Sequence, residues 1–324
     1  MTALNVTQGA TGTRILGTGS YLPERVVTND ELAKVIDTSD EWIRERVGII
    51  ERRAAAPDER LIDLAANAGS RALADAGVAP ADVDTVIVAT CTLPSQIPNA
   101  SARVADMVGI SSAGAFDLNA ACAGFCYAVG TASDLVRSGS ARTVLVVGAE
   151  RFGDWVDPSD RSNAIIFADG AGAAVVAAAE EPAIGPVAWG SAGDLADLIY
   201  MRDERWLFQE GQSVFRWATT KVAPIALRAL ELTGLKPSDV DVLIPHQANL
   251  RIVGAIAKKL RAEGAREDMV VADDIMYTGN TSSASIPIAL DHMRAAGRVH
   301  SGDVLLLVGF GAGLSYAAQV VISP

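Results

Sequence analysis

Apolar and polar positions along the chain alternate between helix-like and strand-like runs, and one such pattern occurs twice. ALADAGVAPADVDTVIVAT at 72–90 and ALELTGLKPSDVDVLIPHQ at 229–247 are identical at eight of nineteen positions, at an offset of 157 residues. Each copy predicts the end of a helix that stops at Gly77 or Gly234, then a turn with a proline, then a strand of Val and Ile. A pattern that repeats at a fixed offset indicates an internal duplication.

Further landmarks keep nearly the same offset. Cys122 matches Asn280 and Gly139 matches Gly297 at 158 residues, and the glycines that end RTVLVVG and DVLLLVG match at 161. We therefore expect a helix from Cys122 to Gly139 and an equivalent helix from Asn280 to Gly297. Each precedes a continuous apolar strand of the kind found in buried sheets.

These patterns predict an α/β protein built from two similar halves related by a pseudo-twofold axis. We place the halves at 1–182 and 183–324, with the EEPAIGP stretch at 180–186 between them. VAWGS after this stretch resembles ILGTGS near the start of the chain. Regions without a counterpart, chiefly 37–60 and 194–215, are candidate insertions that form a substrate entrance.

Composition and charge exclude several classes of function. The formal net charge of -12 opposes general binding to nucleic acid. The N-terminal stretch lacks the apolar core of a secretion signal, and no apolar run reaches the roughly 18 residues of a membrane span. The three cysteines argue against a disulfide framework and for a reducing compartment, so we expect a cytoplasmic protein without membrane contact. With three histidines and no Cys/His cluster, we expect no metal site.

The stretch DLNAACAGFCYAV at 117–129 contains two cysteines with different surroundings. Buried free cysteine usually behaves as a small hydrophobe. Cys122, however, lies at the predicted start of a helix, where backbone N–H groups and the helix dipole lower the pKa of a thiol. Cys126 lies one turn deeper and is expected to be a packing residue. Cys91 follows another strand and is expected to pack near the site.

His246 and Asn280 are expected to meet Cys122 at the pseudo-twofold axis. His246 ends the strand VDVLIP and opens a predicted helix, QANLRIVGAIAKKL, and α/β sheets bind ligands at such strand ends. Either side chain could instead simply cap its helix. Their convergence with the cysteine favours catalysis, and for Asn280 a cap and a catalytic donor are compatible roles.

At this point the sequence resembles the thiolase-fold condensing enzymes, and most closely the β-ketoacyl-acyl carrier protein synthase III family, in particular its actinobacterial members. The resemblance extends over nearly the whole chain. It rests on TSDEWIRERVGI at 38–49, ACAGF at 121–125, DPSDR at 157–161, FADGAGAAVV at 167–176, PHQANLRI at 245–252, GNTSSASIP at 279–287 and GFGAGLSYAA at 309–318. It implies an internally duplicated, five-layered αβαβα fold.

The resemblance implies a catalytic triad of Cys122, His246 and Asn280. An acyl-CoA would acylate Cys122, with the oxyanion held by the backbone N–H groups of Cys122 and Ala312. Malonyl-acyl carrier protein would then lose CO2, and neutral His246 and Asn280 would donate hydrogen bonds to the enolate oxygen. Attack on acyl-Cys122 would release β-ketoacyl-acyl carrier protein, which starts fatty-acid synthesis. CoA thioesters are substrates here, and no cofactor is implied.

The resemblance also implies where the two substrates bind. Trp42 and Arg161 would sandwich the adenine of CoA, and Arg46 and Arg251 would lie near its phosphates, which suits guanidinium chemistry. Without the family, these residues would be ordinary surface arginines and a half-buried tryptophan. Because the carrier protein is acidic and this chain is too, attraction must be local, and we expect docking on Gln247, Arg251, Lys258 and Lys259.

Two departures from the family leave the primer open. The segment at 194–208 is several residues shorter than in most members, and Ile97 stands where the family inserts a side chain across a homodimer interface into the acyl pocket. An aliphatic residue there favours branched or bulky primers. Two alternatives remain: an enzyme that primes polyketide synthesis or transfers acyl groups without condensation, and a non-catalytic partner subunit, which the intact triad argues against.

Overall fold

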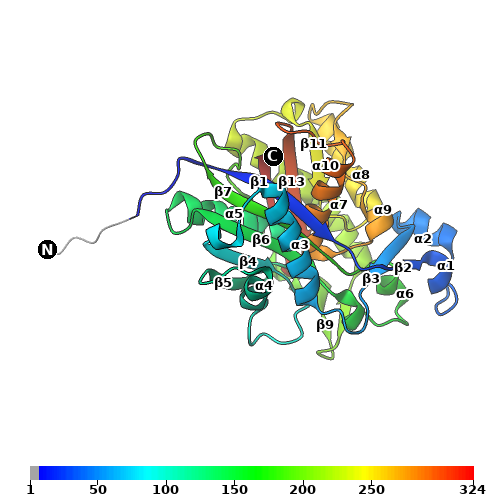
Figure 1. Ribbon diagram of the computed structural model, residues 1–324. Coiled ribbons are helices and arrows are strands. Elements are labelled where there is room, and N and C mark those ends of the chain that lie inside the picture. Colours follow the sequence, from blue (N-terminus) through cyan, green and yellow to red (C-terminus); the bar gives the residue numbers. More distant parts are fainter. Residues whose placement is uncertain (1–6) are drawn as a thin grey trace.

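The computed structural model describes residues 7–324, which form two five-stranded mixed sheets (Figure 1). The first sheet has the order β1 (Gly12–Tyr21), β7 (Gly170–Ala179), β6 (Thr143–Glu150), β4 (Thr85–Ala89) and β5 (Gly114–Leu118). The second has the order β12 (Val270–Val271), β11 (Val242–Pro245), β13 (Val304–Gly311), β14 (Ser315–Ile322) and β8 (Ala188–Ser191). In each sheet a parallel core is extended by two antiparallel strands.

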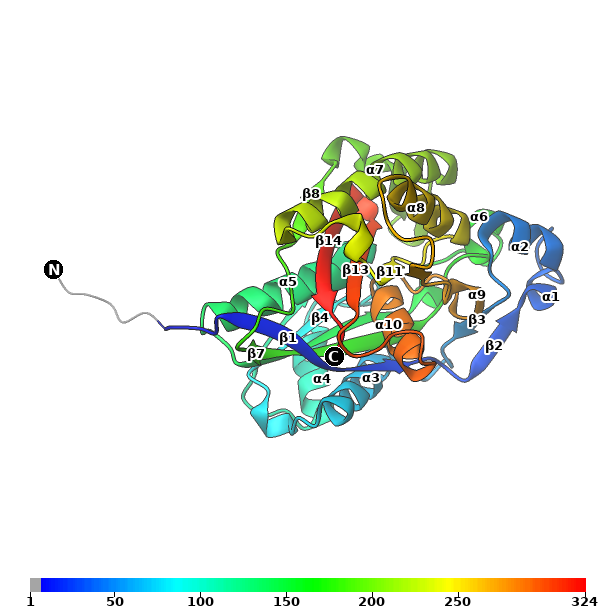
Figure 2. The same ribbon diagram turned by 90° about the horizontal axis from the view of Figure 1, so that it is seen from above.

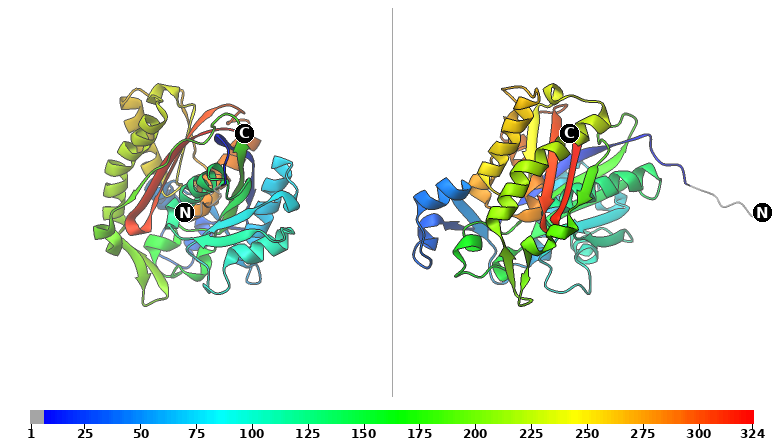
Figure 3. Two further views of the ribbon diagram at one scale, coloured as in Figure 1. Left: turned by 90° about the vertical axis from the view of Figure 1, so that its left-hand side faces the viewer. Right: turned by 180° about the vertical axis from the view of Figure 1, so that it is seen from behind.

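Three layers of helices alternate with the two sheets, which gives five layers in all, visible edge-on in the left panel of Figure 3. Apolar side chains form one core between the sheets, around α5 and α10, and one on the outer face of each sheet. Each helical layer contains one pair of helices. The pairs are α3 (Leu61–Ala76) with α4 (Ala100–Val108), α5 (Gly124–Arg137) with α10 (Ser285–Ala295), and α7 (Gly211–Thr233) with α8 (Leu250–Ala262). None of the helices within 7–324 is long and apolar enough to cross a membrane.

The predicted internal repeat is confirmed in the order and pairing of the elements. Gly77 and Gly234 end α3 and α7 in the left-handed conformation, and each leads through a proline turn, η1 (Pro80–Asp82) or η5 (Pro237–Asp239), into β4 or β11. β1 and β8, which contain the two similar glycine stretches, each pair with the last strand of their half. The division at 182/183 stays a prediction, and it falls in the connection between β7 and β8.

The predicted register of the repeat is wrong by three residues at the central helices. Short 3-10 turns, η2 (Ala121–Ala123) and η6 (Ser282–Ala284), precede α5 and α10, and they stand 161 residues apart, as β6 and β13 do. Ala121 and Ser282 both adopt positive φ, 46° and 48°. Cys122 is therefore equivalent to Ser283, while Asn280 is equivalent to Asn119. The two helices also begin later than predicted, at Gly124 and Ser285, because these turns come first.

The two candidate insertions form the parts of the chain outside the duplicated layers. The first contributes α2 (Asp40–Val47) and β3 (Glu51–Ala54), which pairs with β2 (Arg25–Thr28). The second contributes η4 (Gly193–Leu198) and the hairpin of β9 (Ile199–Arg202) and β10 (Trp206–Gln209). The remaining short helices are α1 (Asn29–Leu32), α6 (Arg161–Ala164), α9 (Ile275–Thr278) and η3 (Phe152–Asp154). Seen from above, α2, α6 and α8 come together at one end of the molecule (Figure 2).

Candidate active site

Cys122 lies in the turn η2, where β13 of the other half approaches it closely. A methyl group built on Gly311, the last residue of β13, would lie 2.8 Å from the backbone nitrogen of Cys122 and 3.0 Å from its Sγ. Only glycine therefore fits at position 311. This contact brings the next residue, Ala312 at the start of η7 (Ala312–Leu314), alongside the cysteine.

The thiol of Cys122 is not acidified in this structure, so the predicted lowering of its pKa is wrong. Cys122 is half-buried, and desolvation by its surroundings raises its pKa to about 12. A hydrogen bond from the Ser282 side chain lowers the pKa, and the nearby carboxyl of Glu150 raises it. Desolvation is the largest of these effects, and α5 begins at Gly124, two residues after the cysteine.

His246 follows β11 and is buried, with 2% of its surface exposed. Its Nδ1 lies 2.7 Å from Oγ of Ser285, and this oxygen also accepts a hydrogen bond from the Gln247 N–H at 3.2 Å. The hydroxyl proton of Ser285 is available for Nδ1, and in the tautomer in which it donates there, the ring proton is on Nε2. Burial lowers the pKa of His246 to about 3, so the ring is neutral and a hydrogen-bond donor near pH 7, as the sequence predicted.

Asn280 enters the turn η6 and has the first of the two roles that the sequence left open, that of a cap; the second, that of a catalytic donor, stays a prediction. Its Oδ1 accepts a hydrogen bond from the Ser282 N–H at 2.8 Å, which caps the turn. Its backbone is fixed between Ile166 and Ala168 by hydrogen bonds of 2.9 and 3.0 Å. Although Asn280 is only 4% exposed, it lines a pocket, and its amide NH2 remains available as a donor.

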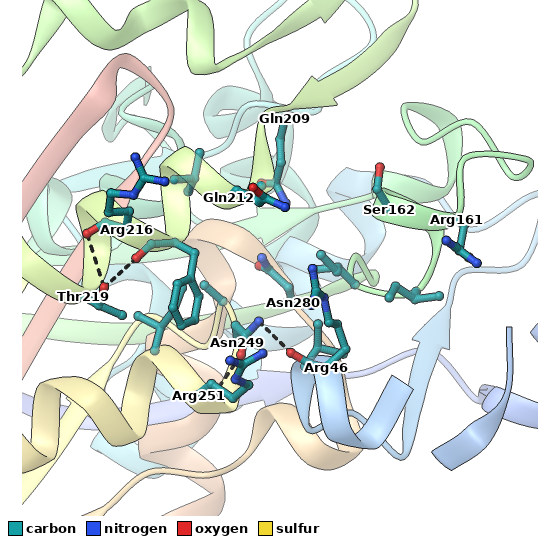
Figure 4. Close-up of a pocket in the computed structure, with 18 of the residues that line it drawn as sticks. Arg46, Arg161, Ser162, Gln209, Gln212, Arg216, Thr219, Asn249, Arg251 and Asn280 are labelled. Atoms are coloured by element: carbon teal, nitrogen blue, oxygen red, sulfur yellow. Dashed lines mark hydrogen bonds between the residues drawn. The ribbon is translucent and has the colours of Figure 1, made fainter. Parts of the chain in front are cut away.

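The large pocket has a volume of about 710 Å³ and extends from the first insertion to Asn280. Figure 4 shows Asn280 between Gln209 and Gln212 on one side and Arg46 and Arg251 on the other. Trp42, Arg46, Arg161 and Arg251, which come from α2, α6 and α8, all line it. The structure thus brings together all four residues predicted to bind CoA.

The predicted sandwich of Trp42 and Arg161 is not formed in this structure. The Arg161 guanidinium stacks directly on the indole, 4.9 Å from the ring centroid, and donates a hydrogen bond to the Asp37 carbonyl at 3.0 Å. An aromatic ring between them would need about 7 Å, twice the usual contact distance of about 3.5 Å. Arg161 must therefore move away from Trp42 before an adenine can enter.

A smaller pocket of about 410 Å³ is lined by residues that neighbour Cys122 in the sequence. Its lining includes Ala121, the neighbour of Cys122, and Ala312, together with a group of apolar side chains from the second insertion. The residues from the second insertion are Ile199, Tyr200, Met201 and Leu207. Phe152 and Trp155 also line the pocket. The residues on either side of the site thus line two different pockets: Asn280 lines the larger one, and Ala121 and Ala312 line the smaller one.

The other two cysteines occupy the places predicted for them. Cys126 is fully buried in the core between the sheets, where Gly309 packs against its sulfur. Cys91 lies near the site, with Sγ 3.4 Å from the Glu150 carboxylate and 3.9 Å from the Ser282 hydroxyl. Burial raises the pKa of both thiols.

Three of the four residues predicted to dock the carrier protein are exposed, and their docking role stays a prediction. Arg251, Lys258 and Lys259 are exposed on α8, whose N-cap is Asn249. Gln247 does not belong to this surface, because it is fully buried and its amide bonds the Pro245 carbonyl and the Ile275 N–H. The helix that was expected to begin at Gln247 begins at Leu250, so Gln247 lies in the buried loop before it.

Sequence reasoning missed four polar residues near the site: Glu150, Ser282, Ser285 and Arg216. Arg216 is exposed on α7 and lines the large pocket beside Phe215, over which Arg251 stacks at 5.2 Å. The two serines belong to the GNTSSASIP stretch, whose density of hydroxyls was the available signal. Ile97 is 86% exposed and lines a separate pocket of about 330 Å³, so its predicted role at a dimer interface stays a prediction.

Comparisons with known proteins extend over the whole chain. Residues 116–193 match the family described as 3-Oxoacyl-[acyl-carrier-protein (ACP)] synthase III, and residues 230–322 match its C-terminal part. The chain is 51% identical to beta-ketoacyl-[acyl-carrier-protein] synthase III 4 of Streptomyces coelicolor, over 97% of this chain and 99% of that protein. It is 46% identical to the mycobacterial beta-ketoacyl-[acyl-carrier-protein] synthase III of Mycobacterium avium, over 100% of this chain and 99% of that protein.

Solved structures give the same result. The priming β-ketosynthase of the R1128 polyketide biosynthetic pathway superposes with a TM-score of 0.95 at 44% identity, covering 100% of this chain and 99% of that chain. The 3-oxoacyl-[acyl-carrier-protein] synthase III of Aquifex aeolicus superposes with a TM-score of 0.91 at 39% identity, covering 96% of this chain and 100% of that chain. The predicted thiolase-like, duplicated αβαβα fold is confirmed.

Proposed function

Because the chain belongs to the 3-oxoacyl-[acyl-carrier-protein] synthase III family of condensing acyltransferases, we propose that Cys122, His246 and Asn280 are its catalytic residues. The observation that carries this proposal is that Asn280 lines the larger pocket, while Ala121, the neighbour of Cys122, and Ala312 line the smaller one. The larger pocket suits a CoA or carrier-protein arm, and the smaller one suits the acyl group that this arm delivers.

In the first half-reaction, the sulfur of Cys122 attacks the thioester carbonyl and CoA leaves. The backbone N–H groups of Cys122 and Ala312 hold the oxyanion, and the contact of Gly311 with Cys122 supports this role for Ala312. Only the N–H of residue 312 is needed, so its methyl group is tolerated. Each such donor contributes roughly 3 to 4 kcal/mol of transition-state stabilisation.

In the second half-reaction, malonyl-acyl carrier protein loses CO2 and an enolate forms. The Nε2–H of His246 and the amide of Asn280 donate hydrogen bonds to the enolate oxygen. Two observations support these roles: Ser285 engages Nδ1 of His246, and Ser282 engages Oδ1 of Asn280. Both side chains are thereby left with a donor for the substrate.

The donor acyl-CoA binds in the large pocket. We assign its phosphates to Arg46 and Arg251 and its adenine to Trp42, once Arg161 has moved off the indole. The acyl group occupies the smaller pocket, which the β9–β10 hairpin closes with Tyr200, Met201 and neighbouring residues. An apolar pocket of about 410 Å³ supports a primer larger than acetyl.

The malonyl-carrying partner docks on exposed cations of α8 and α7, two of which, Arg251 and Arg216, line the large pocket. Arg251, Lys258 and Lys259 on α8 and Arg216 on α7 form this surface, which we call the basic patch. The chain as a whole is acidic, with a net charge of -12, so the patch provides the local attraction for an acidic carrier protein.

A second candidate function is the priming of polyketide synthesis. It is favoured by the likeness to the R1128 priming β-ketosynthase, at a TM-score of 0.95. Both functions use the same site and differ in the primer and in the carrier protein that receives it. Fatty-acid initiation remains the first proposal because the curated relatives at 51% and 46% identity are named as synthase III enzymes.

The working form that we propose is a cytoplasmic homodimer that needs no cofactor. β5 is an edge strand of the first sheet, and Phe116 on it and Ile97 near it are exposed, which supports pairing of two copies along this edge. All three thiols are free, which suits a reducing compartment. Light scattering in solution tests the dimer, and activity after dialysis against EDTA tests the independence from metals.

A panel of acyl-CoA thioesters with malonyl-acyl carrier protein, analysed by mass spectrometry, tests the proposed function. Release of CO2 and a product two carbons longer than the primer support it. The Cys122→Ala variant should lose acylation while it keeps its thermal stability, since the sulfur is half-buried. Transfer of the acyl group without CO2 release would contradict condensation. Transfer to a polyketide carrier protein, but not to the fatty-acid one, would favour the second candidate.

A further inference from the structure

Arg52 is a buried cation on β3, in the first insertion, and only 3% of its surface is exposed. Its guanidinium donates hydrogen bonds to three neutral oxygens: Nη1 to the Val27 carbonyl at 3.2 Å, and Nη2 to Oδ1 of Asn29 at 2.8 Å and to the Ile165 carbonyl at 3.0 Å. Burial lowers the pKa of Arg52 to about 10, so the group stays charged near pH 7. A buried charge bonded only to neutral groups is costly, so stability by itself does not account for an arginine at this position.

The Ile165 carbonyl receives from Arg52 a hydrogen bond that the helix does not supply. Ile165 is the C-cap residue of α6, and a helix that continued past it would direct the N–H of Asp169 at this carbonyl. That N–H donates instead to the Arg53 carbonyl at 3.0 Å. The guanidinium of Arg52 therefore takes the place of the missing helical donor and fixes the chain where it leaves α6.

The residues directly after this point hold Asn280. The N–H of Asn280 donates to the Ile166 carbonyl at 2.9 Å, and its own carbonyl accepts from the Ala168 N–H at 3.0 Å. Gly279, which precedes Asn280, has a φ of 70°, and a methyl group built on it would lie 2.9 Å from Cβ of Arg52. The backbone of Asn280 is thus bonded to a segment whose start Arg52 holds, and Arg52 also packs against the residue before it.

Asn29 extends the contacts of Arg52 to α2. It is 1% exposed, and its Oδ1 accepts the hydrogen bond from Arg52. Its Nδ2 donates to Oδ1 of Asp40 and to the Ile49 carbonyl, both at 2.8 Å. Asp40 is the first residue of α2, and Ile49 follows the C-cap of this helix. The amide of Asn29 therefore bonds the chain at both ends of the helix that carries two of the proposed CoA contacts.

We propose that Arg52 is a positioning residue that sets the place of Asn280 relative to α2. One branch of its contacts leads through Ile165 to the amide that meets the substrate, and the other leads through Asn29 to the helix that binds the CoA nucleotide. Residues of α2 and Asn280 line the same large pocket, so the arginine fixes the distance over which a bound substrate must extend. This inference rests on the proposed function, which supplies the roles of Asn280 and of α2.

Two variants, Arg52→Met and Asn29→Ala, separate the two branches. Arg52→Met removes all three hydrogen bonds, and we expect kcat for condensation to fall about 10²-fold, the cost of a displacement of about 1 Å in a group that meets the substrate. Asn29→Ala leaves the bond to Ile165 in place and should keep this kcat. In both variants, the advantage of acetyl-CoA over acetyl-pantetheine in kcat/KM for acylation should shrink by about 10-fold, because a remote anchor speeds the reaction only when it is in register with the reacting centre.

Arg53→Met is the matched control. Arg53 is the next residue of β3, and its Nη1 donates to the Pro23 carbonyl at 3.2 Å, so this variant removes a guanidinium from the same strand without a change at Ile165 or Asn29. We expect wild-type kinetics for it. If Arg52→Met does not fold, Arg52→Lys replaces it, because lysine keeps the charge but lacks the planar fork. Equal losses in the Arg52 and Arg53 variants, or a loss that only follows the unfolded fraction in thermal melts, would overturn the proposal.

Hydrogen exchange, followed by mass spectrometry of peptides that cover 165–169 and 279–284, tests the same contacts without substrate. In Arg52→Met we expect exchange in both segments to be about 10-fold faster or more, because the bonds between Asn280 and its neighbours then open more often. Arg53→Met should exchange like the wild type. Unchanged exchange in Arg52→Met would contradict the positioning role. A failure of the proposed function would be seen separately, as a wild-type enzyme that exchanges as expected but does not condense.

Discussion

The hydroxyl of Ser285 lies 2.7 Å from Nδ1 of His246, within hydrogen-bond distance of that ring nitrogen. The two residues come from different elements, the start of α10 and the end of β11. When the Ser285 hydroxyl donates to Nδ1, the ring proton is on Nε2, which is the donor that the proposed mechanism needs. We regard Ser285 as a positioning residue, because it acts on the substrate only through His246.

We expect Ser285→Ala to lower kcat for condensation by about 10- to 100-fold, less than the full loss of an enolate donor, and to leave KM for malonyl-acyl carrier protein unchanged. Acylation of Cys122 should be unaffected, since His246 acts in the second half-reaction. Ser133→Ala, which removes another buried hydroxyl bonded to Thr13 at 2.7 Å, is the control. A parallel loss of acylation and condensation would contradict the positioning role.

Gly311→Ala should displace Cys122, because the added methyl group would lie 2.8 Å from its backbone nitrogen. A shift of about 1 Å in a reacting group costs roughly 10²-fold in rate, so we expect at least that loss in single-turnover CoA release. The neighbouring Ala312→Gly should keep most of the activity, because only the N–H of residue 312 takes part. Full activity of Gly311→Ala would show that the close approach is not needed.

Reversal of charge on the basic patch should weaken docking of the carrier protein. We expect the double variant Lys258→Glu and Lys259→Glu to raise KM for malonyl-acyl carrier protein, most strongly at low salt, because exposed charges are screened at higher ionic strength. Its acylation by acyl-CoA should be unchanged. Lys236→Glu, an exposed lysine past the end of α7, controls for net charge. Equal losses in both half-reactions would place the defect elsewhere.

Acid should destabilise the fold through His246. Its pKa is about 3 in the folded chain and 6.5 in the unfolded chain, so below pH 6.5 the unfolded chain binds a proton that the folded chain does not. The stability contributed by the neutral ring is present above pH 6.5 and lost as the pH falls toward 3. Between pH 7.5 and 5, the wild type should lose about 2 kcal/mol more than His246→Gln in urea unfolding. Parallel curves for the two proteins would contradict the low pKa.

Local patterns in the sequence determined the elements and the set of candidate residues. Glycine stops, proline turns and runs of Val and Ile predicted α3, β4, α7 and β11 because these signals act within a few residues of the backbone they shape. The fixed offset of the repeat predicted the duplicated fold, and the roles of Cys122, His246 and Asn280 came from motifs. The register of the central helices could not be obtained in this way, since two left-handed turns precede them.

Only the tertiary structure decided how the site is protonated and which groups are accessible. The thiol of Cys122 and the ring of His246 are desolvated by the residues around them, and desolvation depends on that sum of neighbours rather than on any local motif. Gln247 is buried only in the folded chain. The contacts of Glu150 with Ser282 and Ser283 join positions as far as 133 residues apart. The sequence by itself determined which reactive side chains the protein has, whereas packing between the halves decided which of them holds a proton.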